Sequence, residues 1–322
     1  MIPVIAFING KGRVGTTTLV YHLAWKLADM GYGVLAADLD PQANLTAAFL
    51  DEDDLESLWT ERRPDEARTI SDSLRPLIEG TGGLASATAR AIDSLLYLAP
   101  GDLALAWFED ALAACWPKCA GSRDSAQNIT SAFWRILQSA ASRCGARVIL
   151  MDLGPNLGAI NRAALIAADS IVVPLAPDVG SVEGLRNLGP AIREWRGEWK
   201  SFLERNPGPA LELPQGKLRP EGYVLLRHPV RLDRPVQAYG KWLARLPLEY
   251  SKWISANGAG QDRIASLRYS PSLLQMAKEA RKPVFHLKPA DGALGAHLTA
   301  ANAAGEEYAQ LARELMRRVN VE

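Results

Sequence analysis

A stretch rich in glycine, threonine and basic residues near the start of the chain has the composition of a phosphate-binding loop. It reads N-G-K-G-R-V-G-T-T-T from Asn9 to Thr18. Glycines let the backbone turn tightly, so that successive N–H groups and the N-terminus of a following helix point at one phosphate chain. The stretch therefore predicts a nucleotide cradle, made by Gly10, Lys11, Gly12, Arg13, Val14, Gly15, Thr16, Thr17 and Thr18.

The loop departs from the general P-loop pattern G-x-x-x-x-G-K-[ST] at one position, because Thr16 stands where that pattern has its lysine. A threonine hydroxyl cannot bring positive charge to the β- and γ-phosphates of a nucleotide. Arg13 carries a permanently charged guanidinium suited to phosphate, and it could partly replace the lysine. The alternative is that Arg13 points to solvent and that the loop binds nucleotide weakly or without hydrolysis.

Carboxylates follow two of the apolar runs. The stretch D-L-D-P-Q-A-N, from Asp38 to Asn44, comes directly after the apolar residues 34–37. The stretch D-L-G-P, which begins at Asp152, comes directly after residues 148–151. Phosphoryl transfer to water needs a metal ion and a residue that orients the attacking water, and carboxylates suit both tasks.

These motifs together resemble the ParA/MinD family of deviant P-loop ATPases. The loop is similar to the family's K-G-G-x-G-K-[ST], with Lys11 in its signature position and Arg13 at the second glycine. The two carboxylate stretches are similar to the family's D-x-D-P-Q-x-N and D-x-x-P motifs. The run 171–175, followed by residues 181–184, is like the family's step from strand through proline and loop to helix. A plain glycine-rich turn would account for one such motif, but not for four in order.

The resemblance implies ATP or ADP as the ligand, together with Mg²⁺. By motif position, Thr17 would hold Mg²⁺, Asp152 would act on it through a water, and Asp38 would support the metal and the loop. Asp40 would position the nucleophilic water. Lys11 would reach the nucleotide of a second protomer, so that ATP binding produces a homodimer. The alternatives are that Asp38 and Asp40 cap a turn and that Lys11 is a solvated loop lysine.

The elements that must position these residues alternate along the chain. Short apolar runs predict strands at 3–8, 34–37, 148–151, 171–175, 222–226 and 284–287. Helices are expected at 17–30, around 125–143, at 159–168, 183–204 and 233–245, and near 295–318. Such alternation indicates an α/β fold with a doubly wound, mostly parallel central sheet flanked by helices. Runs 148–151 and 171–173 are expected to be central strands, because strands covered on both faces read as continuous apolar runs.

We expect a single nucleotide-binding domain over residues 1–322, with two segments beyond the nucleotide core. The first, about 49–143, separates the two carboxylate motifs and is expected to be a helical insertion. The second, about 206–261, is expected to be a loop-rich insertion that carries the basic stretch Arg227 to Arg234. The chain begins almost directly with its first strand, so no separate N-terminal DNA-binding domain is expected before it.

Composition limits the partners. The formal net charge is zero, so DNA binding would need a local basic patch, for which the helix near 183–204 with Arg193, Arg196 and Lys200 is a candidate. Its glutamates equally fit an ordinary charged helix with two core tryptophans. Three cysteines and no secretory leader favour the cytoplasm. Cys115 and Cys119 are expected to be packed thiols rather than metal ligands, and no apolar run is long enough to cross a membrane.

The leading hypothesis is a ParA-like ATP switch that dimerises on nucleotide and positions or segregates DNA or protein cargo. Its hydrolysis would be weak or stimulated by a ParB-like adaptor, and nucleoid association would follow from non-specific DNA binding. A second hypothesis is a nucleotide-sensing interaction protein without useful hydrolysis. A third is a metabolic relative, such as an amidase or synthetase, or a nitrogenase-reductase-like protein. The iron–sulfur form of that third hypothesis lacks cysteines near Asp152.

Replacing Thr16 by lysine should raise ATP affinity or turnover. The new ammonium would restore a charge-assisted contact worth about 1.5 to 3 kcal/mol, or roughly tenfold to hundredfold in affinity. Titration calorimetry with ATP and Mg²⁺ on wild type and Thr16→Lys measures the change, with circular dichroism as the check on folding. A folded variant that binds no better would mean that Arg13 or another cation already fills the place of the lysine.

Overall fold

The structure, a computed structural model, describes residues 1–61, 66–86, 89–119, 124–206, 212–227, 236–255, 262–268 and 270–321. Its strands are β1 (Val4–Phe7), β2 (Val34–Asp38), β3 (Arg90–Asp93), β4 (Leu96–Ala99), β5 (Val148–Asp152), β6 (Ser170–Leu175), β7 (Arg219–Arg227) and β8 (Arg263–Arg268). In the described residues they form one eight-stranded sheet of order β3-β4-β2-β5-β1-β6-β7-β8. Neighbouring strands are parallel except β3 and β4, which confirms the α/β prediction. β5 and β6 are central, as expected.

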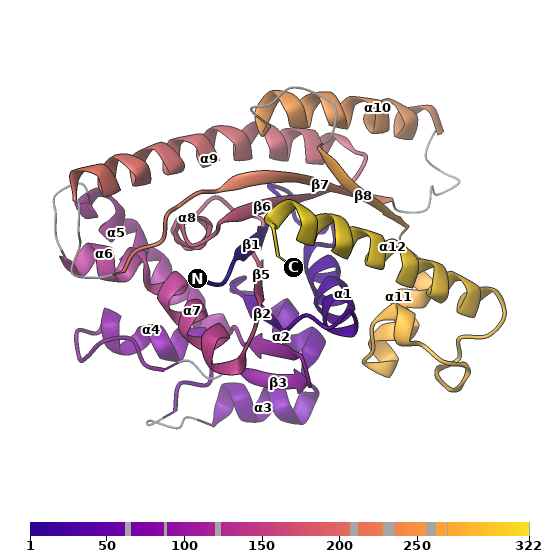
Figure 1. Ribbon diagram of the computed structural model, residues 1–322, viewed down its shortest axis with the longest axis horizontal. Coiled ribbons are helices and arrows are strands. Elements are labelled where there is room, and N and C mark those ends of the chain that lie inside the picture. The colour runs from indigo at the N-terminus through magenta and orange to yellow at the C-terminus, as the bar shows by residue number, and fades with distance from the viewer. Residues whose placement is uncertain are drawn as a thin grey trace.

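Helices cover both faces of this sheet (Figure 1). The α-helices are α1 (Thr16–Asp29), α2 (Asn44–Phe49), α3 (Glu52–Thr60), α4 (Ile70–Ile78), α5 (Glu109–Cys119), α6 (Asp124–Thr130), α7 (Ala132–Cys144), α8 (Ala159–Ile166), α9 (Val179–Arg205), α10 (Val236–Trp253), α11 (Pro271–Ala280) and α12 (Ala296–Val319). Short 3₁₀ helices are η1 (Leu103–Phe108), η2 (Val284–His286) and η3 (Pro289–Asp291).

The alternation of side chains along each strand divides the core into two layers. On β1, Val4 and Ala6 pack in the layer formed by α7, α8 and α9, whereas Ile5 and Phe7 pack in the layer formed by α1, α2 and α12. All four side chains are completely buried. Because neither face of the central strands meets water, both sets of positions must be apolar.

One predicted strand is wrong: residues 284–287 form the 3₁₀ helix η2 rather than a strand. Pro283 lies at its start, and proline cannot donate a ladder hydrogen bond. Val284 and Leu287 are nevertheless buried, in a small core that they share with Leu273 of α11 and Ala301 of α12. The apolar residues thus pack between helices, which a short run cannot reveal by its pattern.

The segment 49–143 is more than a set of helices, because it contributes the hairpin β3–β4 to the sheet. β4 pairs parallel with β2, with Leu96 opposite Val34 and Ala99 opposite Ala37. The segment therefore extends the sheet edge next to the carboxylate strand. In 206–261 the structure describes β7 and α10, whereas residues 228–234 of the basic stretch lie outside the described residues. The later strand β8 pairs with β7 and was not predicted.

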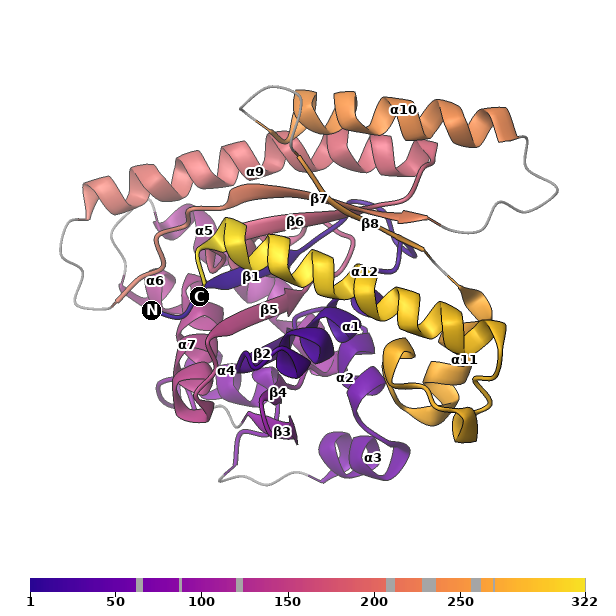
Figure 2. The same cartoon turned by 45° about the vertical axis from the view of Figure 1, so that its right-hand side comes forward.

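The long helices α9 and α10 lie side by side along one edge of the molecule (Figure 2). Their close approach depends on Gly189, since a Cβ there would lie 2.8 Å from the Trp253 carbonyl carbon and would collide with its oxygen. Gly197, on the same helix, has no atom within 4 Å of the corresponding position. Gly189 is therefore required for the packing of α9 against α10, whereas Gly197 affects only the backbone conformation of α9.

Gly189→Ala should destabilise the protein by about 1 to 3 kcal/mol, because the methyl group forces α9 and α10 apart. The matched control Gly197→Ala should stabilise it by about 0.5 to 1 kcal/mol, since alanine has the higher helix propensity and meets open space. Urea unfolding of both variants measures the free energies. Equal effects would mean that α10 does not pack against α9 as described.

Candidate functional site

The glycine-rich loop joins the buried strand β1 to the first turn of α1. Gly15 occupies the N-cap of α1 with a φ of 104°, a left-handed conformation that glycine adopts without strain. α1 runs for 14 residues from Thr16, so its N-terminal N–H groups and dipole face the loop. This is the geometry of an anion cradle.

Two contacts hold the loop against the start of α9. A Cβ on Gly10 would lie 2.9 Å from both the Cα and the oxygen of Gly184, so neither the loop nor α9 could keep its place if Gly10 carried a side chain. The Asn9 side chain accepts a hydrogen bond from the Lys11 N–H at 2.8 Å and donates one to the Pro174 carbonyl at the end of β6. Asn9 was not among the predicted site residues, and its position just before Gly10 is the only signal for it.

The other loop residues take distinct places. Val14 is buried in the layer of α1 and α12, and Gly12 is exposed with its Cβ direction toward Pro155. Thr16 and Thr17 begin α1 and are partly exposed. The Thr18 carbonyl contacts Nδ1 of His22 at 2.7 Å. Thr18 also lines a cavity of about 40 Å³ beside the loop, which extends to the ends of β7 and β8.

Asp38 and Asp152 lie side by side at the carboxyl ends of β2 and β5, where the strand register pairs them directly. Phe7, the last residue of β1 before the loop, is the register partner of Asp152 on the other side. The two carboxylates and the glycine loop therefore occupy one edge of three adjacent parallel strands, as ligands do in open α/β sheets. Asp38 is fully buried and Asp152 is 1% exposed.

The two carboxylates differ in their partners. Oδ2 of Asp38 accepts hydrogen bonds from the Thr46 N–H at 2.7 Å and from its hydroxyl at 2.8 Å. Both oxygens of Asp152 are buried without a hydrogen bond of normal geometry, although the nearby Thr17 hydroxyl acts to lower the pKa of Asp152. Thr46 was not predicted, and it follows the D-x-D-P-Q-x-N motif by two residues.

Burial dominates the electrostatics of this pair. It raises the pKa of Asp38 to about 7, although the hydrogen bonds from Thr46 act in the opposite direction. Burial, and next the nearby charge of Asp38, raise the pKa of Asp152 well above its ordinary value. No lysine or arginine of the described ranges forms an ion pair with either group, so the chain offers no cation to stabilise their ionised forms.

These groups fit a Mg²⁺ ion. The buried oxygens of Asp152 are hard oxygen ligands that accept no hydrogen bond of normal geometry, and the Thr17 hydroxyl is beside them. No three His, Cys, Asp or Glu side chains converge into a metal cage in the part of the chain that the structure describes. Mg²⁺ commonly uses only one or two protein carboxylates, with phosphates and waters as its other ligands, so the small donor set suits this ion.

Asp40 lies at the rim of the same edge. Its Oδ1 accepts a hydrogen bond from the Gln42 N–H at 3.0 Å, and its own N–H donates to Asp38 at 3.3 Å. A Cβ on Gly154 would lie 3.1 Å from Asp40 Oδ1, so the carboxylate rests against the loop that follows β5. Asp40 is partly exposed, between the buried pair and solvent.

The two cations of the loop are placed differently. Lys11 forms an ion pair with Asp178, the N-cap residue of α9, whose Oδ1 also accepts from the Ser181 N–H at 2.9 Å. Asp178 was not predicted, although D-x-x-S before a helix is a capping signal. Arg13 is exposed with a φ of 64°, and its guanidinium pairs with no carboxylate in the described ranges.

Several expectations beside the site can be compared with the structure. His22 packs in the core, stacked on Tyr308 at 5.2 Å, and burial lowers its pKa to about 4. Trp195 and Trp199 of α9 are buried, which agrees with the alternative of a charged helix with two core tryptophans. Cys115 is a buried thiol, whereas the side chain of Cys119 lies outside the described residues.

The fold, together with the sheet edge at which the glycine loop meets Asp38 and Asp152, defines a P-loop nucleotide-binding protein of the deviant type. The sequence profile of a family described as an AAA domain matches residues 2–205. The chain belongs to the ParA/MinD family of P-loop ATPases. It is 28% identical over 203 residues to the chromosome partitioning protein ParA of Caulobacter vibrioides, a match that covers 63% of this chain and 67% of that protein.

Solved structures show the same fold. A Corynebacterium diphtheriae protein has a TM-score of 0.73 at 23% identity and covers 99% of both chains. The ATP complex of Cyanothece McdA has a TM-score of 0.62 at 17% identity, over 100% of this chain and 97% of that one. The chain spans about half the length of two rhizobial relatives, 52% and 50% respectively.

The burial of Asp38 predicts how stability depends on pH. The folded carboxyl keeps its proton up to about pH 7, whereas the unfolded one loses it near its ordinary pKa of 3.8. Between these values the unfolded state binds fewer protons, so the free energy of unfolding falls as pH rises, by up to about 4 kcal/mol from this group. Asp38→Asn should remove that fall, because the amide stays neutral.

Urea unfolding without nucleotide at pH 4.5, 6 and 8 tests this. Asp38→Asn should gain stability relative to wild type as pH rises, whereas Asp110→Asn, an exposed control on α5, should follow wild type. Parallel curves for wild type and Asp38→Asn would contradict the burial of an uncompensated carboxylate.

Proposed function

We propose that the protein is an ATP-binding switch that dimerises on nucleotide and positions or segregates DNA or protein cargo. The observation that carries the proposal is the meeting of the glycine loop with the buried pair Asp38 and Asp152, whose ionised forms have no cation partner in the described residues. Phosphates in the loop and a cation between them and the carboxylates would remove that cost. Membership in the ParA/MinD family supports the same class of activity.

In this mechanism the loop N–H groups and the start of α1 bind the phosphates of ATP. Thr17 and Asp152 would hold Mg²⁺, with Asp38 supporting Asp152 and the loop from β2. The metal would supply charge neutralisation on the β- and γ-phosphates. Asp40, partly exposed at the rim, is placed to accept a hydrogen bond from the attacking water and to orient it.

Arg13 is the residue best suited to replace the charge missing at Thr16. A left-handed conformation costs a residue with a side chain roughly 1 to 2 kcal/mol, and Arg13 adopts it at a position where the family has glycine. Strain of this kind persists where the surrounding structure and the function require it. We infer that the guanidinium contacts the phosphates of its own or a second protomer's nucleotide.

Lys11 would act across the dimer. In the single chain its ammonium is held by Asp178, so formation of the dimer would exchange this ion pair for a contact with the partner's nucleotide. Both side chains are partly exposed, at 36% and 25%, so the exchange needs little rearrangement of the fold. The absent lysine at Thr16 favours a second candidate, a nucleotide-sensing protein that binds and dimerises without useful hydrolysis.

The proposal also includes DNA and an adaptor protein as partners. No helix in the described ranges is long and apolar enough to cross a membrane. Non-specific DNA is a candidate ligand for α9, on which Arg193, Arg196 and Lys200 are exposed; Arg193 also donates a hydrogen bond to the Trp253 carbonyl. DNA binding would place the protein on the nucleoid within the cytoplasm. A ParB-like adaptor would stimulate hydrolysis and release the cargo.

Light scattering with a non-hydrolysable ATP analogue and Mg²⁺ tests the switch. Wild type should shift from monomer to dimer at tens of micromolar, an order-of-magnitude choice for a weak dimer. Lys11→Ala should bind the analogue and remain monomeric, whereas the control Lys278→Ala, an exposed lysine on α11, should dimerise.

Measurement of ATP turnover distinguishes the ATPase switch from the nucleotide sensor without hydrolysis. Release of phosphate from ATP by wild type, lost in Asp40→Ala, would support the ATPase. Analogue-dependent dimerisation without turnover, alone or with DNA, would favour the nucleotide sensor. A wild type that binds the analogue and stays monomeric would overturn the proposed switch.

A further inference from the structure

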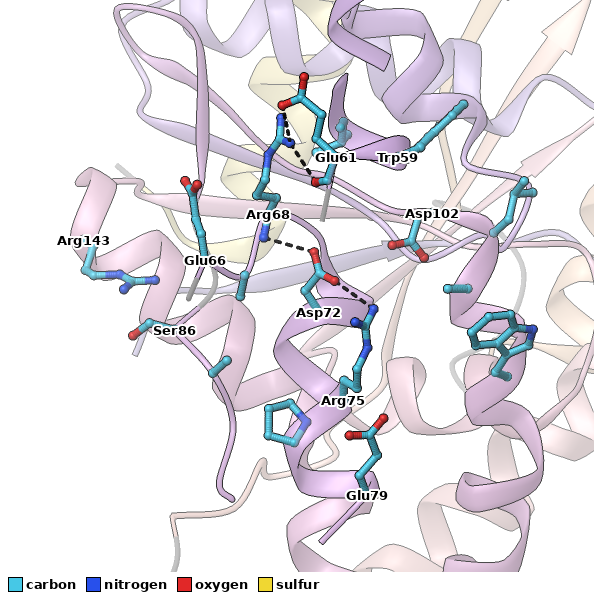
Figure 3. Close-up of a pocket in the computed structure, with 17 residues that line it drawn as sticks. Trp59, Glu61, Glu66, Arg68, Asp72, Arg75, Glu79, Ser86, Asp102 and Arg143 are labelled. Atoms are coloured by element: carbon cyan, nitrogen blue, oxygen red, sulfur yellow. Dashed lines mark hydrogen bonds and ion pairs between the residues drawn. The ribbon is translucent and has the colours of Figure 1, made fainter. Parts of the chain in front are cut away.

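The segment 49–143 contains a partly open cavity of about 950 Å³ (Figure 3). The cavity lies away from the nucleotide edge, which is the sheet edge that carries the glycine loop, Asp38 and Asp152. Its walls come from α3, α4, η1 and the end of α7. The nucleotide chemistry described above uses none of the side chains that line it. A cavity of this size is large enough for several side chains of a bound segment.

Apolar side chains gather at its rim. Trp107 is 75% exposed, Leu103 is 63% exposed and Trp59 is 40% exposed. Large apolar groups that are this exposed and close together are typical of binding surfaces, and tryptophan is enriched among the residues that dominate binding energy. On α9, by contrast, Trp195 and Trp199 are buried in the core.

The polar lining is acidic. Five carboxylates line the cavity against three guanidinium groups, so the lining has a formal charge of −2. Arg75 is paired with Asp72 at 3.0 Å, and Arg68 donates to the Ser57 carbonyl at 2.8 Å. Glu79, at the end of α4, is exposed and forms no ion pair within the described ranges. The surface therefore complements an apolar ligand that carries positive charge.

One wall of the cavity is connected to Asp38. The indole N–H of Trp59 donates to the Gly101 carbonyl at 3.3 Å, and the Gly101 N–H donates to the Thr46 hydroxyl at 2.9 Å. That hydroxyl donates to Asp38 at 2.8 Å. Gly101 also packs directly on Asp38, since a Cβ there would lie 3.2 Å from the Asp38 Cβ.

A second wall is connected to the loop after β5. η1, which carries Leu103 and Trp107, continues directly into α5. Glu109, the first residue of α5, accepts hydrogen bonds from the Ala159 N–H and, at 2.9 Å, from the Ile160 N–H at the start of α8. A displacement of η1 would therefore reach the start of α8, which follows β5 and Asp152 along the chain.

We propose that this cavity is the docking site for a short, basic, amphipathic segment of a partner protein, and that docking is energetically coupled to the nucleotide edge. Its apolar side chains would contact Trp59, Leu103 and Trp107, and a lysine or arginine would pair with Glu79. The coupling part rests on the proposed function, whereas docking does not. Because coupling is reciprocal, nucleotide must change the affinity for the segment by the factor with which the segment changes nucleotide affinity.

The docking part is tested without nucleotide. The probe is a fluorescein-labelled synthetic peptide of 15 residues with leucines at i, i+3, i+4 and i+7 spacing and lysines elsewhere. Its control replaces every lysine by glutamate. Fluorescence anisotropy should show saturable binding of the lysine peptide, about tenfold weaker for Trp107→Ala and for Glu79→Lys. The matched controls Leu248→Ala and Glu306→Lys, exposed on α10 and α12, should bind as wild type does.

The coupling part compares peptide affinity with and without Mg²⁺ and the ATP analogue, at a protein concentration below dimerisation. We expect a change of about fivefold or more. Trp59→Phe keeps an aromatic side chain but removes the N–H that donates to Gly101, so it should reduce that change toward onefold. Its peptide affinity without nucleotide serves as the reference.

The outcomes are distinguishable. Equal binding of the lysine and glutamate peptides, or equal affinity of the cavity and control variants, overturns the docking site whether or not the analogue binds. Docking with no effect of a bound analogue overturns the coupling and leaves the switch intact. Docking by a protein that does not bind the analogue refutes the proposed function alone.

Discussion

The burial of Asp38 and Asp152 next to each other is the constraint on which the rest of this edge depends. Two carboxyl groups without a paired cation in the described residues are costly in a low-dielectric interior, and both respond with a raised pKa. Thr46 satisfies one of them by hydrogen bonds, and the oxygens of Asp152 remain without a donor. A cost of this kind is retained where a ligand relieves it.

The same constraint explains the small residues around the edge. Gly101 must lack a side chain to pack on Asp38, and Gly154 lies against Asp40. Gly10 and Gly184 allow the loop to touch α9. The two cations of the loop lie around these glycines. Lys11 is held by Asp178, and Arg13 extends to solvent from a strained backbone. The loop thus presents two cations outside the position that Thr16 occupies.

The segment 49–143 is integrated with this edge rather than appended to it. Its strand β4 pairs with β2, its Gly101 contacts Asp38, and its Glu109 caps the start of α8. A change in the segment can therefore alter the positions of both carboxylate strands through direct contacts. This arrangement gives the cavity of the segment a physical route to the nucleotide chemistry.

The sequence alone determined the α/β class, the central strands and the positions of the loop and carboxylate motifs, because these depend on apolar periodicity and on local spacing. It could not reveal β3, β4 and β8, whose short runs become strands only when a neighbouring strand pairs with them. It misassigned 284–287, which packs between helices. Tertiary structure alone placed Asp38 against Thr46 and Gly101, and Lys11 against Asp178. Such contacts join residues far apart along the chain, and the strand register that creates them has no local signal.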